Sequence, residues 1–153
     1  IIVKKFNNKE GLLLFWNLLK NLHDKLGYTN LTLNLYENIM HKYSTNKKAH
    51  ILIAFKDQMP ISGLLMVGNG NYMHYYKGAS KFKVKNYGQG ELLQWEAIKL
   101  ARLLDSGFYD LCNLNSKKLP EIYKFKTGIS NNIYKYPIYN SKSLAYKIIS
   151  RVI

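Results

Sequence analysis

Apolar residues recur first at helical and then at strand spacing along this chain. Six of them share one face over residues 13–26, between Asn8, which can cap a helix, and Gly27, which can end one. The spacing predicts a helix there and a second, weaker helix over residues 32–43. Residues 1–6 fit either a short strand or a linker.

The pattern then changes to three consecutive strands. Apolar runs cover residues 51–55 and 61–67, joined by a hairpin connection over 56–60. A strong turn signal at residues 68–71 precedes a third strand over 72–79. Connections this short exclude crossovers, so the three strands are predicted to form an antiparallel meander.

A helix over residues 91–104 follows, ended by Gly107. The next strand, over 109–114, must run parallel to the third because a helical crossover separates them. Pro120 begins a short helix. A last strand over 133–139 and a last helix over 143–153 complete the prediction.

This element order resembles that of the N-acyltransferase fold, the GNAT superfamily. We therefore expect an α+β (mixed α/β) class, with a central, mostly antiparallel sheet flanked by helices. At 153 residues the chain is predicted to form one domain, residues 1–153. It lacks an initiator methionine, so we expect it to be part of a longer, two-domain protein.

The chain is strongly basic, with 23 lysine and arginine residues against 9 acidic ones and a net charge of +14. No acidic residue occurs between Asp57 and Glu91 or after Glu121, which favours a polyanion or an anionic surface as partner. Drift toward the residues encoded by AT-rich DNA is the alternative explanation.

Other chemistry is limited by what the chain contains. The single cysteine, Cys112, excludes an intrachain disulfide and is expected to be a small core residue inside a strand. The four histidines are scattered and form no zinc-binding spacing with it, so no metal site is predicted. No apolar run approaches the roughly 18–20 residues that span a bilayer.

A glycine-containing loop follows the third strand. Lys85, Gly88, Gln89 and Gly90 have the spacing of the loop that binds the acyl-CoA pyrophosphate in N-acyltransferases, which they resemble. Glycines let backbone N–H groups approach an anion, and the dipole of the following helix favours negative charge. A plain turn is the alternative.

Four motifs resemble those of the Fem family of peptidoglycan interpeptide-bridge peptidyltransferases. Trp95 lies in one of them and is expected to pack in the interior. The motifs are Gly78-Ala79-Ser80, Leu92-Leu93-Gln94-Trp95-Glu96, Phe108-Tyr109-Asp110 and Tyr123-Lys124-Phe125-Lys126-Thr127-Gly128.

The resemblance implies transfer of an amino acid from aminoacyl-tRNA to an amine of a nucleotide- or lipid-linked peptidoglycan precursor. Such enzymes combine two GNAT-like domains and act in the cytoplasm, at or near the inner face of the membrane. This chain would be the second domain, its partners being tRNA, the precursor, the preceding domain and the anionic membrane surface. No tightly bound cofactor is expected.

The resemblance also implies site residues. Phe125 and Lys126 map onto a pair at the catalytic centre, where Lys126 would stabilise the charge that develops on a carbonyl oxygen or bind a phosphate. Tyr75 and Tyr76 point to opposite faces of a strand, and Tyr76 is taken as the catalytic candidate. Tyr123 and Lys124 are candidates for substrate or anion binding. Asp110 orients a catalytic group or is a strand-end carboxylate.

Three functions follow from these observations. The first is a Fem-type aminoacyltransferase. The second is an acyl-CoA-dependent N-acyltransferase, favoured by the glycine loop. The third is a non-catalytic module that binds RNA or a membrane surface, favoured by charge alone.

Overall fold

The computed structural model describes residues 1–27, 32–44, 48–69 and 71–134. Residues 131–134 have no regular structure. The remainder of the strand predicted over 133–139 and the whole helix predicted over 143–153 lie outside the described residues.

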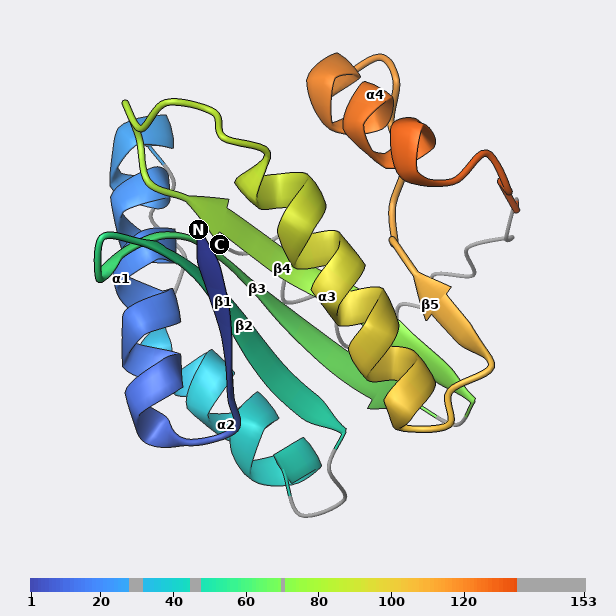
Figure 1. Ribbon diagram of the computed structural model, residues 1–153, viewed down its shortest axis with the longest axis horizontal. Coiled ribbons are helices and arrows are strands. Elements are labelled where there is room, and N and C mark those ends of the chain that lie inside the picture. Colours follow the sequence, from blue (N-terminus) through green and yellow to red (C-terminus); the bar gives the residue numbers. More distant parts are fainter. Residues whose placement is uncertain (28–31, 45–47, 70, 135–153) are drawn as a thin grey trace, which may run out of the picture.

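Five strands and four helices make up the described part of the chain, in the predicted order (Figure 1). Their bounds are β1 Ile2–Phe6, α1 Lys9–Leu26, α2 Leu33–Ser44, β2 Ala49–Lys56, β3 Met59–Asn69, β4 Tyr72–Ser80, α3 Gln89–Leu103, β5 Phe108–Asp110 and α4 Pro120–Ile129.

The strands form one sheet in the order β1-β2-β3-β4-β5. Every neighbouring pair is antiparallel except β4 and β5, which run parallel. The meander and the parallel crossover strand are therefore confirmed. The open alternative for residues 1–6 is decided in favour of a strand, because β1 pairs with β2 along its whole length.

Local chemistry explains the first helix. Asn8 accepts a hydrogen bond from the Gly11 N–H at 3.1 Å, and Gly27 ends the helix with φ 71°. The hairpin between β2 and β3 is tighter than predicted, because only Asp57 and Gln58 form the turn. Both have positive φ, 49° and 66°, as turns that match the twist of antiparallel strands require.

Two apolar cores lie on opposite faces of the sheet. On one face α1 and α2 cover a cluster that includes Phe15, Leu19 and Ile53, each 0% exposed. On the other face α3 buries its predicted apolar side against Leu64 and Met66 (Figure 1). The sheet is thus covered on both faces, and α4 lies apart, beyond β5 (Figure 1).

The bounds of α3 and β5 also differ from the prediction. Helix α3 begins at Gln89 and ends at Leu103, so Gly107 does not end it. The N–H of Gly107 donates to the Asn71 side chain at 2.6 Å and so joins the start of β5 to the start of β4. Strand β5 has three residues instead of six. None of the helices in the described ranges is long and apolar enough to cross a membrane.

Candidate active site

Strands β4 and β5 separate soon after they meet. Only Tyr72, Met73 and His74 of β4 pair with β5, while β4 continues to Ser80. A bulge interrupts the pairing of β4 with β3 just beyond this point, because Tyr75 pairs with Met66 but Lys77 pairs with Leu65. The edge of β4 from Tyr75 onward is therefore not paired with β5, and bulges of this kind re-aim side chains next to active sites.

A cavity of about 390 Å³ lies beside this free part of β4. Its walls come from the end of β4, the first turn of α3, the preceding loop, and Phe125 of α4. The ring of Phe125 would lie 3.4 Å from a Cβ added at Gly90, so a side chain there would narrow the space between the two helices. Tyr75 and Ser80 mark the extent of the cavity along β4.

The glycine loop enters α3 in a way that presents backbone N–H groups. Gly88 occupies the N-cap with φ 74°, a conformation that favours glycine. Side-chain oxygens of Asn86 and Gln89 accept hydrogen bonds from the N–H groups of Gly88 and Tyr87, at 2.9 and 2.7 Å. Gln89 and Gly90, predicted as loop residues, lie in the first turn of α3, where N–H groups have no intrahelical acceptor.

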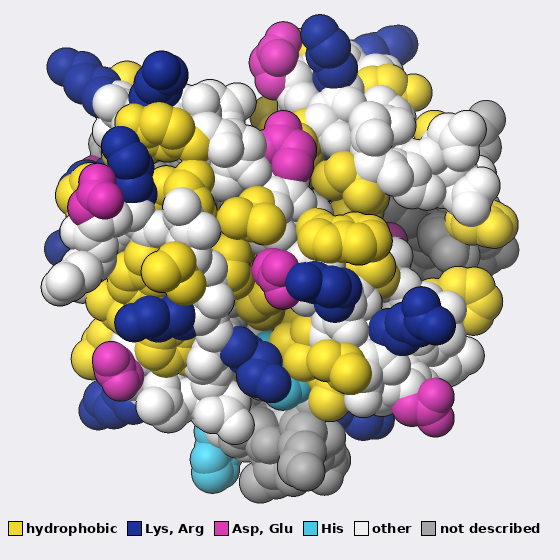
Figure 2. Space-filling view, in the orientation of Figure 1, with side chains coloured by type: hydrophobic (Ala, Val, Ile, Leu, Met, Phe, Trp, Pro, Cys, Tyr) yellow, Lys and Arg dark blue, Asp and Glu magenta, His cyan; other side chains and the backbone are white. Residues whose placement is uncertain are grey.

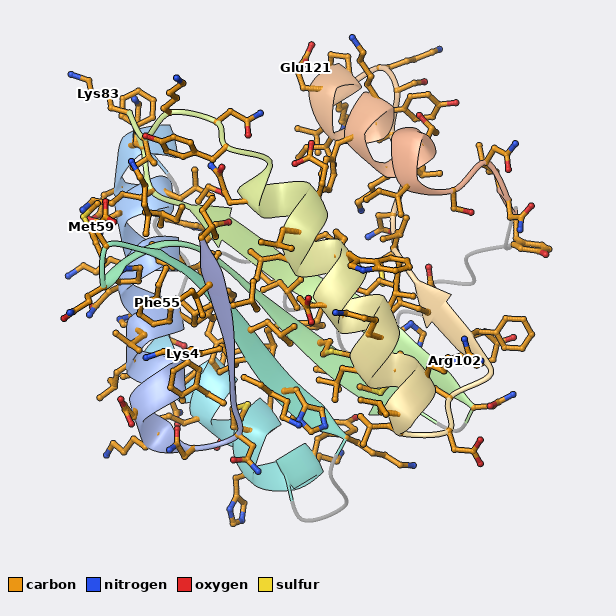
Figure 3. The ribbon with its side chains drawn as sticks, viewed as in Figure 1. Lys4, Phe55, Met59, Lys83, Arg102 and Glu121 are labelled. Carbon is orange, nitrogen blue, oxygen red and sulfur yellow. The ribbon has the colours of Figure 1, made fainter. Side chains whose placement is uncertain are left out.

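Basic side chains surround this loop. Lys56 donates to the Tyr87 hydroxyl at 2.8 Å, which raises the pKa of Lys56, and Lys85 lies 5.8 Å from the same ring. Lys83 lies at the corner where β4 leads toward α3 (Figure 3). Figure 2 shows basic side chains gathered at that corner, but elsewhere on this face they alternate with acidic ones.

Lys126 of α4 is buried, with 7% of its surface exposed, and is not the solvated lysine of a short surface helix. Its ammonium donates to the carbonyl oxygens of Cys112 and Asn113, at 3.2 and 3.0 Å. It also lies 5.5 Å from the centre of the Tyr75 ring. Burial lowers the pKa of Lys126, and the neighbouring Cys112 and Asp110 oppose that shift.

The two adjacent tyrosines of β4 have different surroundings. Tyr75 lines the cavity and contacts Lys126, and burial raises its pKa. Tyr76, the predicted catalytic candidate, is 46% exposed and lies on the side of α2, near Tyr36. Burial raises the pKa of Tyr36, and the neighbouring Tyr76 adds to that shift. The structure therefore brings Tyr75, rather than Tyr76, to Lys126.

Sequence reasoning missed a cluster at the point where β4 and β5 separate. His74 Nδ1 lies 3.3 Å from Asp110 Oδ2 and 3.9 Å from Cys112 Sγ. Cys112 is neither in a strand nor in the core, because it lies two residues after β5, half-buried, with φ 57°. Burial, with a contribution from Asp110, raises the pKa of its thiol to about 11.

Residues 7–126 match the family model described as an acetyltransferase (GNAT) domain. The chain belongs to this family. The match ends at Lys126, so it includes both the glycine loop and the buried lysine. No curated protein sequence is significantly similar to the chain.

Solved structures support the GNAT fold. A GNAT family acetyltransferase from Staphylococcus aureus has a TM-score of 0.60 and 17% identity, over 93% of this chain and 98% of that one. The aminoglycoside 6′-N-acetyltransferase AAC(6′)-IG from Acinetobacter haemolyticus has a TM-score of 0.69 and 14% identity, over 94% of this chain and 99% of that one. Aminoglycoside N-acetyltransferase AAC(6′)-Iy, solved with CoA, has a TM-score of 0.65 and 11% identity, over 93% of this chain and 99% of that one.

The remaining predicted residues of this GNAT domain are distributed around the site. Lys124 is exposed and Tyr123 half-buried on α4, so neither shares the environment of Lys126. On α3, Gln94 is buried and accepts a hydrogen bond from Tyr109 at 2.7 Å. Trp95 is 58% exposed, and its predicted packing role is wrong.

Proposed function

We propose that this chain is an N-acyltransferase that takes its acyl group from acyl-CoA and transfers it to an amine. The observation that carries the proposal is the cavity between the unpaired part of β4 and the glycine-capped start of α3. It joins a loop suited to binding an anion to a cleft that reaches Tyr75, whose ring lies 5.5 Å from the Lys126 ammonium. Membership of the GNAT family and similarity to a structure solved with CoA support the same donor.

The donor's pyrophosphate fits the first turn of α3. The N–H groups there and the helix dipole favour an anion, and Gly88 adds no side chain of its own to the approach. Lys85 and its neighbours add positive charge. Glu91, in the same turn, opposes an anion: its Oε2 lies 4.0 Å from the position of a Cβ at Gly88, so the carboxylate would have to turn away when the donor binds.

The chemistry requires a neutral amine, which attacks the thioester carbonyl carbon. A C–N bond forms, the C–S bond breaks, the amine gives up a proton, and CoA leaves as a thiolate that is protonated. Lys126 directs two of its three N–H donors at the carbonyls of Cys112 and Asn113. We assign its third donor to the substrate carbonyl oxygen, where negative charge develops.

An aminoacyl-tRNA donor, as in Fem-type enzymes, is the second candidate. It is favoured by one observation: the Phe125-Lys126 pair that carries the resemblance contributes a buried lysine and a cavity-lining ring. The ester carbonyl of aminoacyl-tRNA would react in the same way, with an amine of a peptidoglycan precursor as acceptor. The partners of this second candidate would be tRNA, a preceding domain and an anionic membrane surface in the cytoplasm.

Calorimetric titration with acetyl-CoA, charged tRNA and anionic vesicles, each at two salt concentrations, separates these functions. The acyl-CoA proposal predicts saturable 1:1 binding of acetyl-CoA that persists at high salt. The non-catalytic basic module predicts a different result. The chain would then bind tRNA and vesicles but not acetyl-CoA, it would not distinguish charged from uncharged tRNA, and the binding would weaken steeply as salt rises. Tight binding of charged tRNA over uncharged tRNA would support the Fem-type donor.

A further inference from the structure

Three side chains that can bind a metal converge where β4 and β5 separate. His74 comes from β4, Asp110 is the last residue of β5, and Cys112 follows two residues later. The parallel pairing of β4 with β5 places His74 directly opposite Asp110. One ligand atom from each residue lies within 4.8 Å of the other two.

Two distances among these atoms are close to those around a tetrahedral zinc ion. Zn–N and Zn–O bonds of about 2.1 Å at the tetrahedral angle place the two atoms about 3.4 Å apart, and a Zn–S bond of about 2.3 Å places sulfur about 3.6 Å from nitrogen. The distances are 3.3 Å between His74 Nδ1 and Asp110 Oδ2, and 3.9 Å between Nδ1 and Cys112 Sγ. Small side-chain adjustments therefore suffice.

Neighbouring contacts hold the ligands in place. The Cys112 N–H donates to Asp110 Oδ1 at 2.7 Å, which fixes the carboxylate and leaves Oδ2 toward His74. Tyr72 stacks on the His74 ring with centroids 5.9 Å apart. Lys126 binds the Cys112 carbonyl oxygen and so anchors the segment that carries the thiol. Supporting contacts of this kind orient metal ligands.

The donor set selects among metals. A thiolate, an imidazole and one carboxylate favour zinc over magnesium or calcium, which prefer oxygen ligands. The thiolate and carboxylate together balance the two charges of the ion. Three protein ligands leave one tetrahedral position for water or a substrate atom.

We propose that His74, Asp110 and Cys112 form a Zn²⁺ site with one open coordination position. Neutral His74 binds the ion through Nδ1, with its proton on Nε2, and Cys112 binds as thiolate after releasing one proton to solvent. The site departs from the absence of metal expected from sequence spacing, and it does not depend on the identity of the acyl donor.

Alkylation of Cys112 tests this directly, because it is the only cysteine in the chain. Wild-type protein treated with a chelator and then given one equivalent of Zn²⁺ should react with iodoacetamide more than about tenfold slower than the metal-free protein. Chelator should restore the rate, and Mg²⁺ at the same concentration should leave it unchanged. An unchanged rate with Zn²⁺ overturns the proposal even before any variant is made.

Two variants and two matched controls locate the ligands. Substitutions His74→Phe, which keeps a ring against Tyr72, and Asp110→Asn should abolish protection by Zn²⁺. The controls His41→Gln, on α2, and Asp105→Asn, both at exposed positions, should keep it. If Zn²⁺ still protects Cys112 from alkylation in both ligand variants, the ion binds the thiol without His74 and Asp110, and the proposed site is refuted. Cobalt substitution adds a spectroscopic readout, since thiolate-to-cobalt absorption should appear only where protection does.

Discussion

The two sides of β4 are built differently. Toward β3 it joins a broad antiparallel sheet in which β2 and β3 alone share eight residue pairs, over a core whose largest side chains are fully buried. Toward β5 it has only three residue pairs. Of their side chains only Met73 is buried, while Tyr72 and Phe108 are exposed and the others, His74 among them, are half-buried.

The difference separates stability from chemistry. Apolar burial under α1 and α2 stabilises the fold, because each buried large side chain contributes about 1.5–3 kcal/mol. The β5 side carries the positive φ of Cys112 and the shifted pKa values of Tyr75 and Lys126. Strain and perturbed pKa values concentrate at functional sites. We therefore expect substitutions on the two sides to act on different observables.

The largest effect should come from the core. Phe15→Ala removes a fully buried ring and should lower the free energy of unfolding by about 3–5 kcal/mol. Leu103→Ala, on a side chain 83% exposed, should change it by less than about 0.5 kcal/mol. Urea denaturation measures both. Equal losses of unfolding free energy in the two variants would contradict the assignment of stability to the core under α1 and α2.

On the other side, Lys126→Ala should reduce transfer by about 10²–10³-fold, the loss typical of a removed oxyanion donor. The circular dichroism spectrum should stay that of the wild type. Lys124→Ala, two residues away and exposed, should retain full activity. Wild-type rates in Lys126→Ala would remove this residue from the catalytic site.

A smaller effect is expected at the loop. Gly88→Val forces a β-branched residue into φ 74° and places a side chain where the pyrophosphate would approach, so the Kd for acetyl-CoA should rise at least tenfold. Gly128 lies on α4, where no atom is within 4 Å of an added Cβ, so Gly128→Val should leave the Kd unchanged. Calorimetry compares the two, and matching affinities would argue against binding at this loop.

The smallest effect concerns pH. Burial raises the pKa of Tyr36 to about 12, so the stability linked to its proton is complete below its unfolded value of about 10 and is lost as pH rises toward 12. Between pH 9 and pH 11 the stability advantage of wild type over Tyr36→Phe should fall by about 1 kcal/mol. Urea titrations at the two pH values measure it. A stability difference between wild type and Tyr36→Phe that is the same at both pH values would contradict a buried Tyr36 hydroxyl.

The fold could be predicted because its signals are local. Asn8 and Gly27 bound α1 by their own chemistry, and apolar periodicity gives the helix and strand types. Strand β5 was predicted too long because its end depends on separation from β4, which no short pattern encodes. Trp95 is exposed because the buried face of α3 passes through Leu93 and Ala97 instead.

The candidate site was only partly accessible to sequence reasoning. Lys126 was found through a motif, and the loop through its glycines. His74, Asp110 and Cys112 were not found as a group, because 36 residues separate the first two and only the parallel register brings them together. The choice between Tyr75 and Tyr76 depended on a bulge that the sequence does not mark.

We propose that the start of α3 and the free edge of β4 hold an acyl-CoA donor. Backbone amide NMR during titration with CoA tests it most directly. Binding there should cause saturable shifts at the amides of residues 87–92 and 75–80, with the amides of α2 unchanged. Shifts scattered over exposed lysines and abolished by salt, with the α3 amides unmoved, would contradict it.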